Sequence, residues 1–210
     1  MMRRFRNSRV VAFSTGNVYG LTTPASGGST EADPPAPTGE YAMSCLGRER
    51  LIEFMSLTHG TPAAILRLNY ANELRYGTLA DLARTVFEGR PIDLAMGYLN
   101  AIWQGDANAM ALQSFDHVSS PPAVLNLAGP EVLSVRAVAE EFGRLLDKPV
   151  RFEGTEAPDA LLSNPARAVE WFGPPRVAIP RLMQWIADWI ARGGPSLGKP
   201  THFEVRDGAF

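Results

Sequence analysis

The sequence is short of the residue types that build disulfide and metal sites. Among its 210 residues there is a single cysteine, Cys45, so an internal disulfide framework is excluded. The three histidines, His59, His117 and His202, are too widely separated in the sequence to form a usual metal-binding motif. We therefore expect neither a disulfide-stabilised domain nor a metal centre.

The sequence also lacks an excess of charge and a long apolar run. Its formal net charge is −2, which provides no basic surface for nucleic acid and no polybasic patch for a membrane. The apolar run from Val10 to Phe13 is too short for a signal-peptide core, and no stretch is long enough to span a bilayer. We expect a cytoplasmic protein that binds a small-molecule substrate, and neither nucleic acid nor a membrane.

What is present is an alternation of apolar strands and amphipathic helices. Apolar runs predict buried strands at Arg9 to Ser14, Ala63 to Leu68 and Val124 to Leu127. Apolar residues at helical spacing predict five helices: from Thr38 to Gly60, from Thr78 to Gly89, from Asp106 to His117, from Ser134 to Leu146 and from Pro180 to Gly193. This order predicts an α/β fold with a parallel sheet.

Several local patterns refine this picture. Thr38 and Ser134 are expected to be helix N-caps, and Thr78 with Asp81 resembles a capping box. Residues 21–40 are rich in Gly, Ser, Thr and Pro and predict a long loop. Short strands expected within residues 91–104 and 150–152 indicate a second lobe, and Pro195 to Phe210 are expected to form a tail or loop.

Two segments carry the functional interpretation. The first is FSTGNVYG at residues 13–20, at the end of a predicted strand, and the second is YAMSC at residues 41–45, in a predicted helix. Together they resemble the extended short-chain dehydrogenases/reductases, also called the NAD-dependent epimerase/dehydratase family. The resemblance implies that Thr15 is the catalytic hydroxyl and that Tyr41 is the catalytic tyrosine.

The resemblance extends over most of residues 8–192. ILRLNY at residues 65–70 is similar to the next strand of the family, whose following backbone approaches the nicotinamide ring of NAD or NADP. The implied cofactor-binding residues are Ser14, Tyr41, Cys45, Leu68, Asn69 and Tyr70. The implied substrate-binding residues are Thr15, Asn17 and Asn69.

The family fold implies two parts. We expect the C-terminal part of a Rossmann-like, doubly wound parallel sheet, formed by residues 1–90 with residues 118–147. Residues 91–117 and 148–210 are expected to form a small α+β substrate lobe that includes the C-terminal helix and tail.

The expected chemistry divides between cofactor and protein. Exchanging hydrogen at a carbon–oxygen bond needs a hydride partner, which is the cofactor, and a proton partner at the oxygen. A tyrosine has a pKa of about 10, too high for an efficient base at neutral pH. Lowering it by about three units corresponds to roughly 4 kcal/mol of preference for the phenolate. In the family, a lysine one helical turn after the tyrosine has this effect and also binds the nicotinamide ribose.

Cys45 occupies the position of that lysine. A thiol near Tyr41 does not lower its pKa, and an ionised thiol would raise it. The chain has two lysines, Lys148 and Lys199, and neither is near in sequence. Arg48, one further turn along the helix, is an alternative cation. We expect Tyr41 to stay protonated, which weakens catalysis without excluding proton donation to a carbonyl.

A second departure concerns the phosphate loop. Only 14 residues precede Thr15, whereas the family's glycine-rich loop lies roughly a hundred residues before the catalytic hydroxyl. Gly27 and Gly28 are not followed by a predicted helix and do not form such a loop. The chain therefore resembles a truncated member of the family, and we expect weak cofactor affinity and an open sheet edge at the strand from Arg9 to Ser14.

Three functional hypotheses remain open. The first is an NAD(P)-dependent oxidoreductase, epimerase or dehydratase acting on a sugar-like or small carbonyl or hydroxyl substrate. The second is a non-catalytic relative that binds a nucleotide or metabolite as a sensor or scaffold, which the cysteine in place of lysine favours. The third is an inactive fragment. The resemblance also implies a homodimer formed through the Tyr41 helix.

Overall fold

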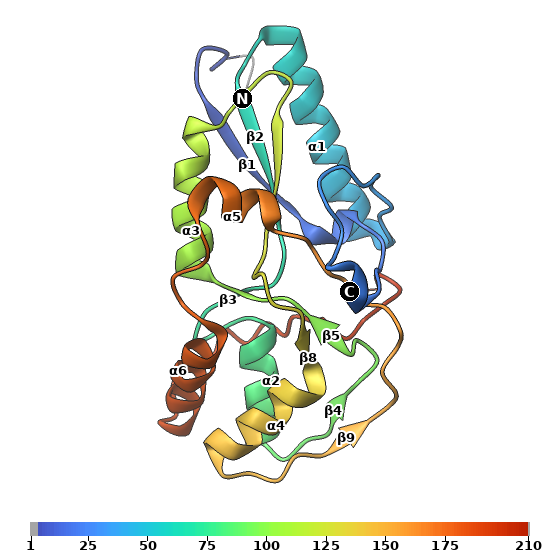
Figure 1. The fold of residues 1–210 in the computed structure, drawn as a ribbon, viewed down its shortest axis with the longest axis vertical. Coiled ribbons are helices and arrows are strands. Elements are labelled where there is room, and N and C mark those ends of the chain that lie inside the picture. The colour runs from blue at the N-terminus through green and yellow to red at the C-terminus, as the bar shows by residue number, and fades with distance from the viewer. Residues whose placement is uncertain (1–3, 210) are drawn as a thin grey trace.

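The computed structural model describes residues 4–209, which form an elongated molecule with a sheet at one end and a helical lobe at the other (Figure 1). The sheet has three parallel strands in the order β1-β2-β7, with bounds Val10–Thr15, Ala63–Leu68 and Ala123–Leu127. The α helices are α1 (Gly39–His59), α2 (Thr78–Phe87), α3 (Gln104–Gln113), α4 (Val135–Leu146), α5 (Ala166–Phe172) and α6 (Ile179–Ala191). The α/β fold with a parallel sheet is confirmed.

Short elements complete the chain. The two-residue strands are β3 (Ala71–Asn72), β4 (Ile92–Asp93), β5 (Tyr98–Leu99), β6 (Ile102–Trp103), β8 (Leu133–Ser134) and β9 (Phe152–Glu153). They pair as β3 with β6, β4 with β9, and β5 with β8. The 3-10 helices span Gly16–Val18, Pro24–Ser26 and Ser114–Asp116.

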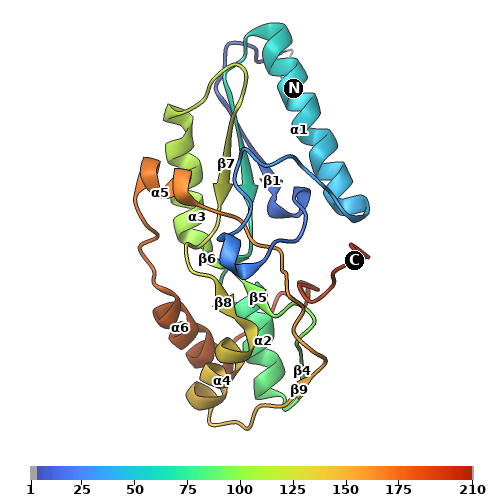
Figure 2. The ribbon, with the colours of Figure 1, turned by 45° about the vertical axis from the view of Figure 1, so that its right-hand side comes forward.

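Both faces of the sheet are covered, as expected for a doubly wound fold. In both ribbon views α1 lies on one side of the strands, while α3 and α5 lie on the other (Figures 1 and 2). Successive side chains along a strand point to opposite faces of the sheet, so each strand contributes side chains to both layers of helices. Leu66 and Leu125 pack in the cluster that includes Met110 of α3. Arg67, the next residue of β2, instead reaches Glu49 of α1.

The two edges of the sheet differ. At β7 the backbone N–H of Asn126 donates to the Glu31 carboxylate at 2.8 Å, and the Arg167 guanidinium donates to the Val124 carbonyl at 3.0 Å. At the opposite edge, β1 pairs only with β2 among the described residues, and Phe13 is 45% exposed. The open edge predicted for this strand is therefore present.

The second lobe contains the larger hydrophobic cluster. Its helices are α2, α4 and α6, which contact one another in all three combinations. Phe142 of α4 and Leu182 of α6 are fully buried there, as is Leu79 of α2. The apolar stripes predicted from the sequence are the surfaces that meet in this cluster.

The packing divides the chain differently from the predicted boundaries. Helices α2 and α4, assigned to the sheet part as portions of 1–90 and 118–147, belong to the second lobe because their apolar stripes face α6. Helix α3, assigned to the substrate lobe within 91–117, packs on the sheet through Ala107 and Met110. The second lobe is consequently larger than expected.

The predicted helix starts agree with the structure more closely than the predicted N-cap hydrogen bonds do. Ser134 accepts a hydrogen bond from the backbone N–H of Ala137, which confirms this N-cap. Thr38 is the N-cap residue of α1 but makes no side-chain capping bond. The predicted capping box at Thr78 is wrong: Gly77 precedes the helix, and Asp81 binds the C-terminal segment instead.

Residues 195–209, here called the C-terminal strap, contain no helix or strand. The strap returns from the end of α6 across the lobe and ends beside the start of α1 (Figure 2). Its Gly208 lies directly against Gly39, where a Cβ on either glycine would collide with the other backbone. The predicted tail is thus packed against both lobes.

Candidate active site

Thr15 lies where the three strands of the sheet end together. It is the last residue of β1 and pairs with Leu68 of β2, which pairs with Leu127 of β7. The carboxyl ends of parallel strands are the usual ligand-binding edge of an open α/β sheet. The Thr15 Oγ1 accepts a hydrogen bond of 3.2 Å from the backbone N–H of Asn17, which leaves the hydroxyl proton available for donation.

Tyr41 lies in the first turn of α1 and is half exposed. Tyr41 and Thr15 line the same cavity. Partial burial raises the pKa of Tyr41, and the hydrogen bond to Thr15 opposes this shift only in part. Tyr41 is therefore a protonated phenol at neutral pH. The two residues predicted to converge on one reacting oxygen do lie together.

Cys45 lies one helical turn after Tyr41 and is buried against Val18 and Tyr19. Its Sγ accepts a hydrogen bond of 3.4 Å from the Arg48 guanidinium. Cys45 contributes to raising the pKa of Tyr41, and Arg48 has a smaller opposing effect. Arg48 is thus near the site, as the alternative required, but it does not replace the effect of a lysine.

A buried ion pair joins the helix of Tyr41 to the sheet. The Arg67 guanidinium donates to both carboxylate oxygens of Glu49, at 3.0 and 2.8 Å, and both side chains are less than a tenth exposed. The Ser14 hydroxyl donates to the same carboxylate at 2.5 Å. This bidentate pair fastens α1 to β1 and β2, and thereby positions Tyr41.

The network continues to the third strand. Arg67 donates to the Tyr19 hydroxyl at 2.6 Å, and Tyr19 donates to the Asn126 side-chain oxygen at 2.9 Å. Burial lowers the pKa of Arg67, but the hydrogen bonds to Glu49 and Tyr19 and the attraction of these two groups together outweigh it, so this pKa is raised. Burial raises the pKa of Tyr19. The network therefore contains one cation, one anion and neutral partners.

Sequence reasoning missed this network, although it left two traces. Glu49 lies eight residues after Tyr41, so the two share a helix face with Cys45 between them. Arg67 is the one charged residue in an otherwise apolar predicted strand. A charge in a buried strand requires a partner, and a carboxylate on the covering helix is the simplest one.

The residues after β2 form the opposite wall of the site. The Asn69 amide donates to the Asn100 side-chain oxygen at 2.9 Å, so Asn69 is fixed by the second lobe. Tyr70 has a φ of 43°, which is uncommon for a residue other than glycine. Burial raises the pKa of Tyr70, and the carboxylate of Glu204 raises it further.

These residues surround a cavity of ≈ 570 Å³. Six of the predicted site residues line it: Thr15, Asn17, Tyr41, Leu68, Asn69 and Tyr70. The remaining wall comes from Ala71, from residues 76–78 and from strap residues 200–202. Ser14 and Cys45, predicted to contact a cofactor, do not line the cavity. The Ser14 hydroxyl is bound to Glu49, and Cys45 packs against Val18 and Tyr19.

The described residues include no group of histidine, cysteine, aspartate and glutamate side chains that could bind a metal ion. His117 instead stacks on Trp171, with ring centroids 4.3 Å apart. Within residues 4–209, no helix has the length and apolar character needed to cross a bilayer.

Comparison with solved structures identifies the fold. The chain superposes on UDP-glucose 4-epimerase from Thermus thermophilus in complex with NAD (TM-score 0.73, 20% identity, 89% of this chain and 65% of that chain). It also superposes on dTDP-glucose 4,6-dehydratase from Bacillus anthracis in complex with NAD (0.76, 17%, 91% and 64%) and on RMD from Pseudomonas aeruginosa complexed with NADPH (0.72, 19%, 88% and 67%). The fold resemblance predicted from the sequence is confirmed.

The chain spans less than two thirds of the length of the first two of these structures. No family model matches the sequence, and no curated protein sequence matches it. The similarity therefore establishes the fold, and function must be argued from the site.

Proposed function

We propose that this chain carries the proton-transfer site of an NAD- or NADP-dependent oxidoreductase, epimerase or dehydratase that acts on a sugar-like or other small carbonyl or hydroxyl substrate. The observation that carries the proposal is that Thr15 and Tyr41 line one substrate-sized cavity at the ends of the parallel strands. The fold neighbours solved with NAD and NADPH support the cofactor class.

The described residues fit one end of such a cofactor. The cavity beside Tyr41 is lined by Leu68 and Tyr70, which offer the apolar and aromatic surface that a nicotinamide ring requires. None of the described residues forms a glycine-rich turn that leads into a helix and could hold the pyrophosphate. When bound, the cofactor would supply or accept a hydride.

The protein's own part is to orient the substrate oxygen and to exchange its proton. Thr15 accepts from Asn17 and so donates its own hydroxyl proton, either to Tyr41 or to a substrate oxygen at the same place. Tyr41, protonated at neutral pH, donates a proton to that oxygen as negative charge develops on it. The raised pKa of Tyr41 favours reduction of a carbonyl over oxidation of an alcohol.

The test is turnover of the chain with NADH or NADPH and a panel of small aldehydes and ketones, followed by nicotinamide absorbance. Tyr41→Phe should reduce turnover by about a hundredfold or more, the usual contribution of a proton-transfer group. Tyr98→Phe is the matched control, because Tyr98 lies on β5 in the second lobe. Wild-type turnover that Tyr41→Phe leaves unchanged would show that the site is wrongly assigned.

A second candidate function is a non-catalytic sensor or scaffold that binds a nucleotide or metabolite. The buried Cys45 in the lysine position favours it, because the pKa of Tyr41 stays high. Tight cofactor binding by calorimetry, without turnover on any carbonyl, would support this candidate over the first.

We also propose that the chain forms a homodimer through α1. This helix exposes Met43, Leu51, Phe54 and Leu57, each more than half exposed, which is unusual for one helix of a monomer. Light scattering after size exclusion should give a dimer mass for the wild type and a monomer mass for Phe54→Glu. Leu112→Glu, on α3, is the matched control and should remain a dimer.

A further inference from the structure

The C-terminal strap is anchored at successive points along its length. Both the backbone N–H and the hydroxyl of Thr201 donate to the Asp81 carboxylate, at 2.7 and 2.8 Å. Phe203 is 7% exposed and belongs to the core cluster of the second lobe. The Arg206 guanidinium binds both the carboxylate and the carbonyl oxygen of Asp159. Charge-assisted and buried contacts of this kind fix the segment in place.

Strap residues line three separate cavities. His202 lines three cavities: the candidate active site of ≈ 570 Å³, a cavity of ≈ 490 Å³ against α2, and a remnant of ≈ 70 Å³. The remnant lies between the strap and the residues that follow β1, including Asn17 and Tyr19. Strap residues 201–203, 205, 206 and 208 form much of its lining.

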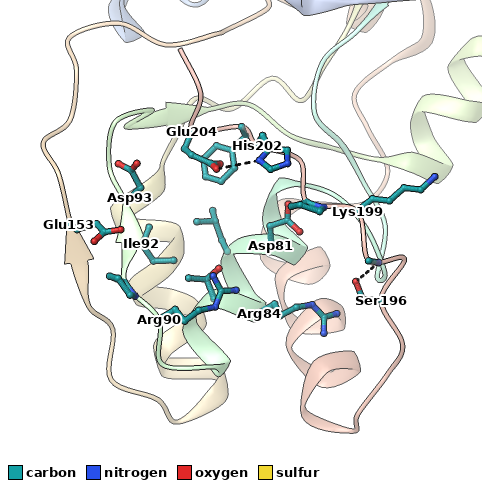
Figure 3. A pocket seen from close by; sticks show the side chains of 16 residues that line it. Asp81, Arg84, Arg90, Ile92, Asp93, Glu153, Ser196, Lys199, His202 and Glu204 are labelled. Atoms are coloured by element: carbon teal, nitrogen blue, oxygen red, sulfur yellow. Dashed lines mark hydrogen bonds and ion pairs between the residues drawn. The ribbon is translucent and has the colours of Figure 1, made fainter. Parts of the chain in front are cut away.

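The two large compartments differ in charge. Among the described residues that line the candidate active site there is no aspartate, glutamate, lysine or arginine. The neighbouring cavity is rich in them, and Figure 3 shows Asp93 and Glu153 on one side and Arg84 and Arg90 below. Arg84 and Arg90, which could bind a phosphate group, therefore line the neighbouring cavity and not the candidate active site.

Backbone strain occurs at the same wall. Three described residues other than glycine have positive φ, and two of them, Tyr70 at 43° and His202 at 50°, line the candidate active site. Such conformations persist where the surrounding contacts over-determine them, and they concentrate at ligand-binding sites. The anchors at Thr201 and Phe203, on either side of His202, supply those contacts.

We propose that the C-terminal strap is the specificity element of this site and restricts its substrate to a small, uncharged hydroxylated or carbonyl compound contacted by Thr201 and His202. The proposal rests on the proposed function and names its substrate class. A substrate that carries a diphosphate would lose hydration in a compartment that offers hydroxyl, amide and imidazole groups but no cation. A neutral polyol exchanges hydrogen bonds with water for hydrogen bonds with those same groups.

The experiment measures ligand binding by the full chain without cofactor, by calorimetry and ligand-observed NMR. The probes are D-glucose, D-xylose, myo-inositol and dihydroxyacetone, each compared with UDP-glucose. We expect at least one neutral probe to bind at least tenfold more tightly than UDP-glucose. His202→Ala and Thr201→Ala should each weaken that binding at least fivefold, and His59→Ala, at the far end of α1, should leave it unchanged.

A second variant opens the strap. Arg206→Ala removes the bonds to Asp159 and should increase hydrogen exchange of residues 200–208 while the rest of the chain keeps its protection. In this variant the preference for neutral probes should fall, because UDP-glucose gains access to the compartment beyond the strap. Hydrogen exchange reports correct folding of each variant independently of ligand binding.

Three results would overturn the proposal. The first is tighter binding of UDP-glucose than of every neutral probe by the wild type, above all if Arg84→Ala abolishes it, because the Arg84 Nη2 is buried without a hydrogen-bond partner among the described residues. The second is neutral binding that His202→Ala and Thr201→Ala leave unchanged. The third is no binding of any probe. Because no turnover is measured, neutral binding that depends on His202 would stand even if the oxidoreductase proposal failed.

Discussion

Substitution of Glu49 by glutamine tests whether the buried ion pair fastens the Tyr41 helix to the sheet. Glutamine keeps the size and one acceptor oxygen, so the Ser14 hydroxyl retains a partner. It removes the charge opposite Arg67, whose side chain is 7% exposed and cannot turn to water without leaving the interface between α1 and β2. The substitution therefore leaves a buried cation with neutral partners alone.

The expected magnitude follows from the burial of both partners. Removing one partner of a buried ion pair costs about 3–5 kcal/mol, since the remaining charge stays desolvated. For a chain of this length, 1 kcal/mol lowers the melting temperature by about 2–4 °C, so Glu49→Gln should lower it by roughly 6–20 °C. The double variant Glu49→Met with Arg67→Met should recover at least about half of this loss, because no charge remains buried.

The assay is thermal and urea unfolding followed by circular dichroism. Glu53→Gln is the matched control on the same helix: Glu53 pairs with Arg50 at 3.1 Å, but both side chains are largely exposed. An exposed pair contributes less than about 1 kcal/mol, so this control should shift the melting temperature little. Equal shifts for Glu49→Gln and Glu53→Gln, or a double variant worse than the single one, would refute the reasoning.

Three further predictions follow from the same structure. Cys45→Lys places an ammonium about 6 Å from the phenol and should lower the pKa of Tyr41 by about two units, measured by ultraviolet difference titration against Tyr41→Phe. Gly129→Ala should destabilise the fold by at least about 1–3 kcal/mol in urea, because its Cβ would overlap a backbone carbonyl oxygen, whereas Gly47→Ala, in open space on α1, should stabilise it by about 0.5–1 kcal/mol. A hydrogen bond from Arg136 lowers the pKa of Glu156. The wild type should therefore be more stable than Glu156→Gln above about pH 4.3, and this difference should vanish as the pH falls below that value, measured by unfolding across the acid range.

Each of these has an outcome that contradicts it. An unshifted Tyr41 titration in Cys45→Lys would mean that the lysine ammonium turns away from the phenol. A Gly129→Ala variant as stable as the wild type would show that the loop retreats without cost. A stability difference for Glu156→Gln that persists at pH 3 would assign the effect to packing rather than charge.

The sequence predicted local structure well where one apolar face decides it. The strand that carries Thr15 and the helix that carries Tyr41 followed from apolar spacing and helix start signals, and the two residues line the same cavity. The raised pKa of Tyr41 agrees with the expectation that it stays protonated, although burial contributes more to it than Cys45, whose position i+4 on the helix is a local relation.

Contacts between distant segments were beyond such reasoning. Arg67 finds Glu49 across 18 residues and Tyr19 across 48, and no local rule selects these partners among the other charges. The same limit explains the misplaced domain boundary, since α2 shows an apolar stripe but not which helices will cover it. Thr201 and His202 were not predicted to line the site, because an irregular tail has no periodicity from which to infer burial.

The unpaired side of β1 has a practical consequence for anyone who handles the purified polypeptide. The segment VVAFST at residues 10–15 contains no proline or charged residue, the two features that usually prevent an edge strand from pairing with another molecule. The backbone N–H and C=O groups on its unpaired side can pair with strands of other molecules, so the protein should form β-rich aggregates as its concentration rises. A lysine introduced at Phe13 should delay that self-association, visible as a later onset of thioflavin fluorescence.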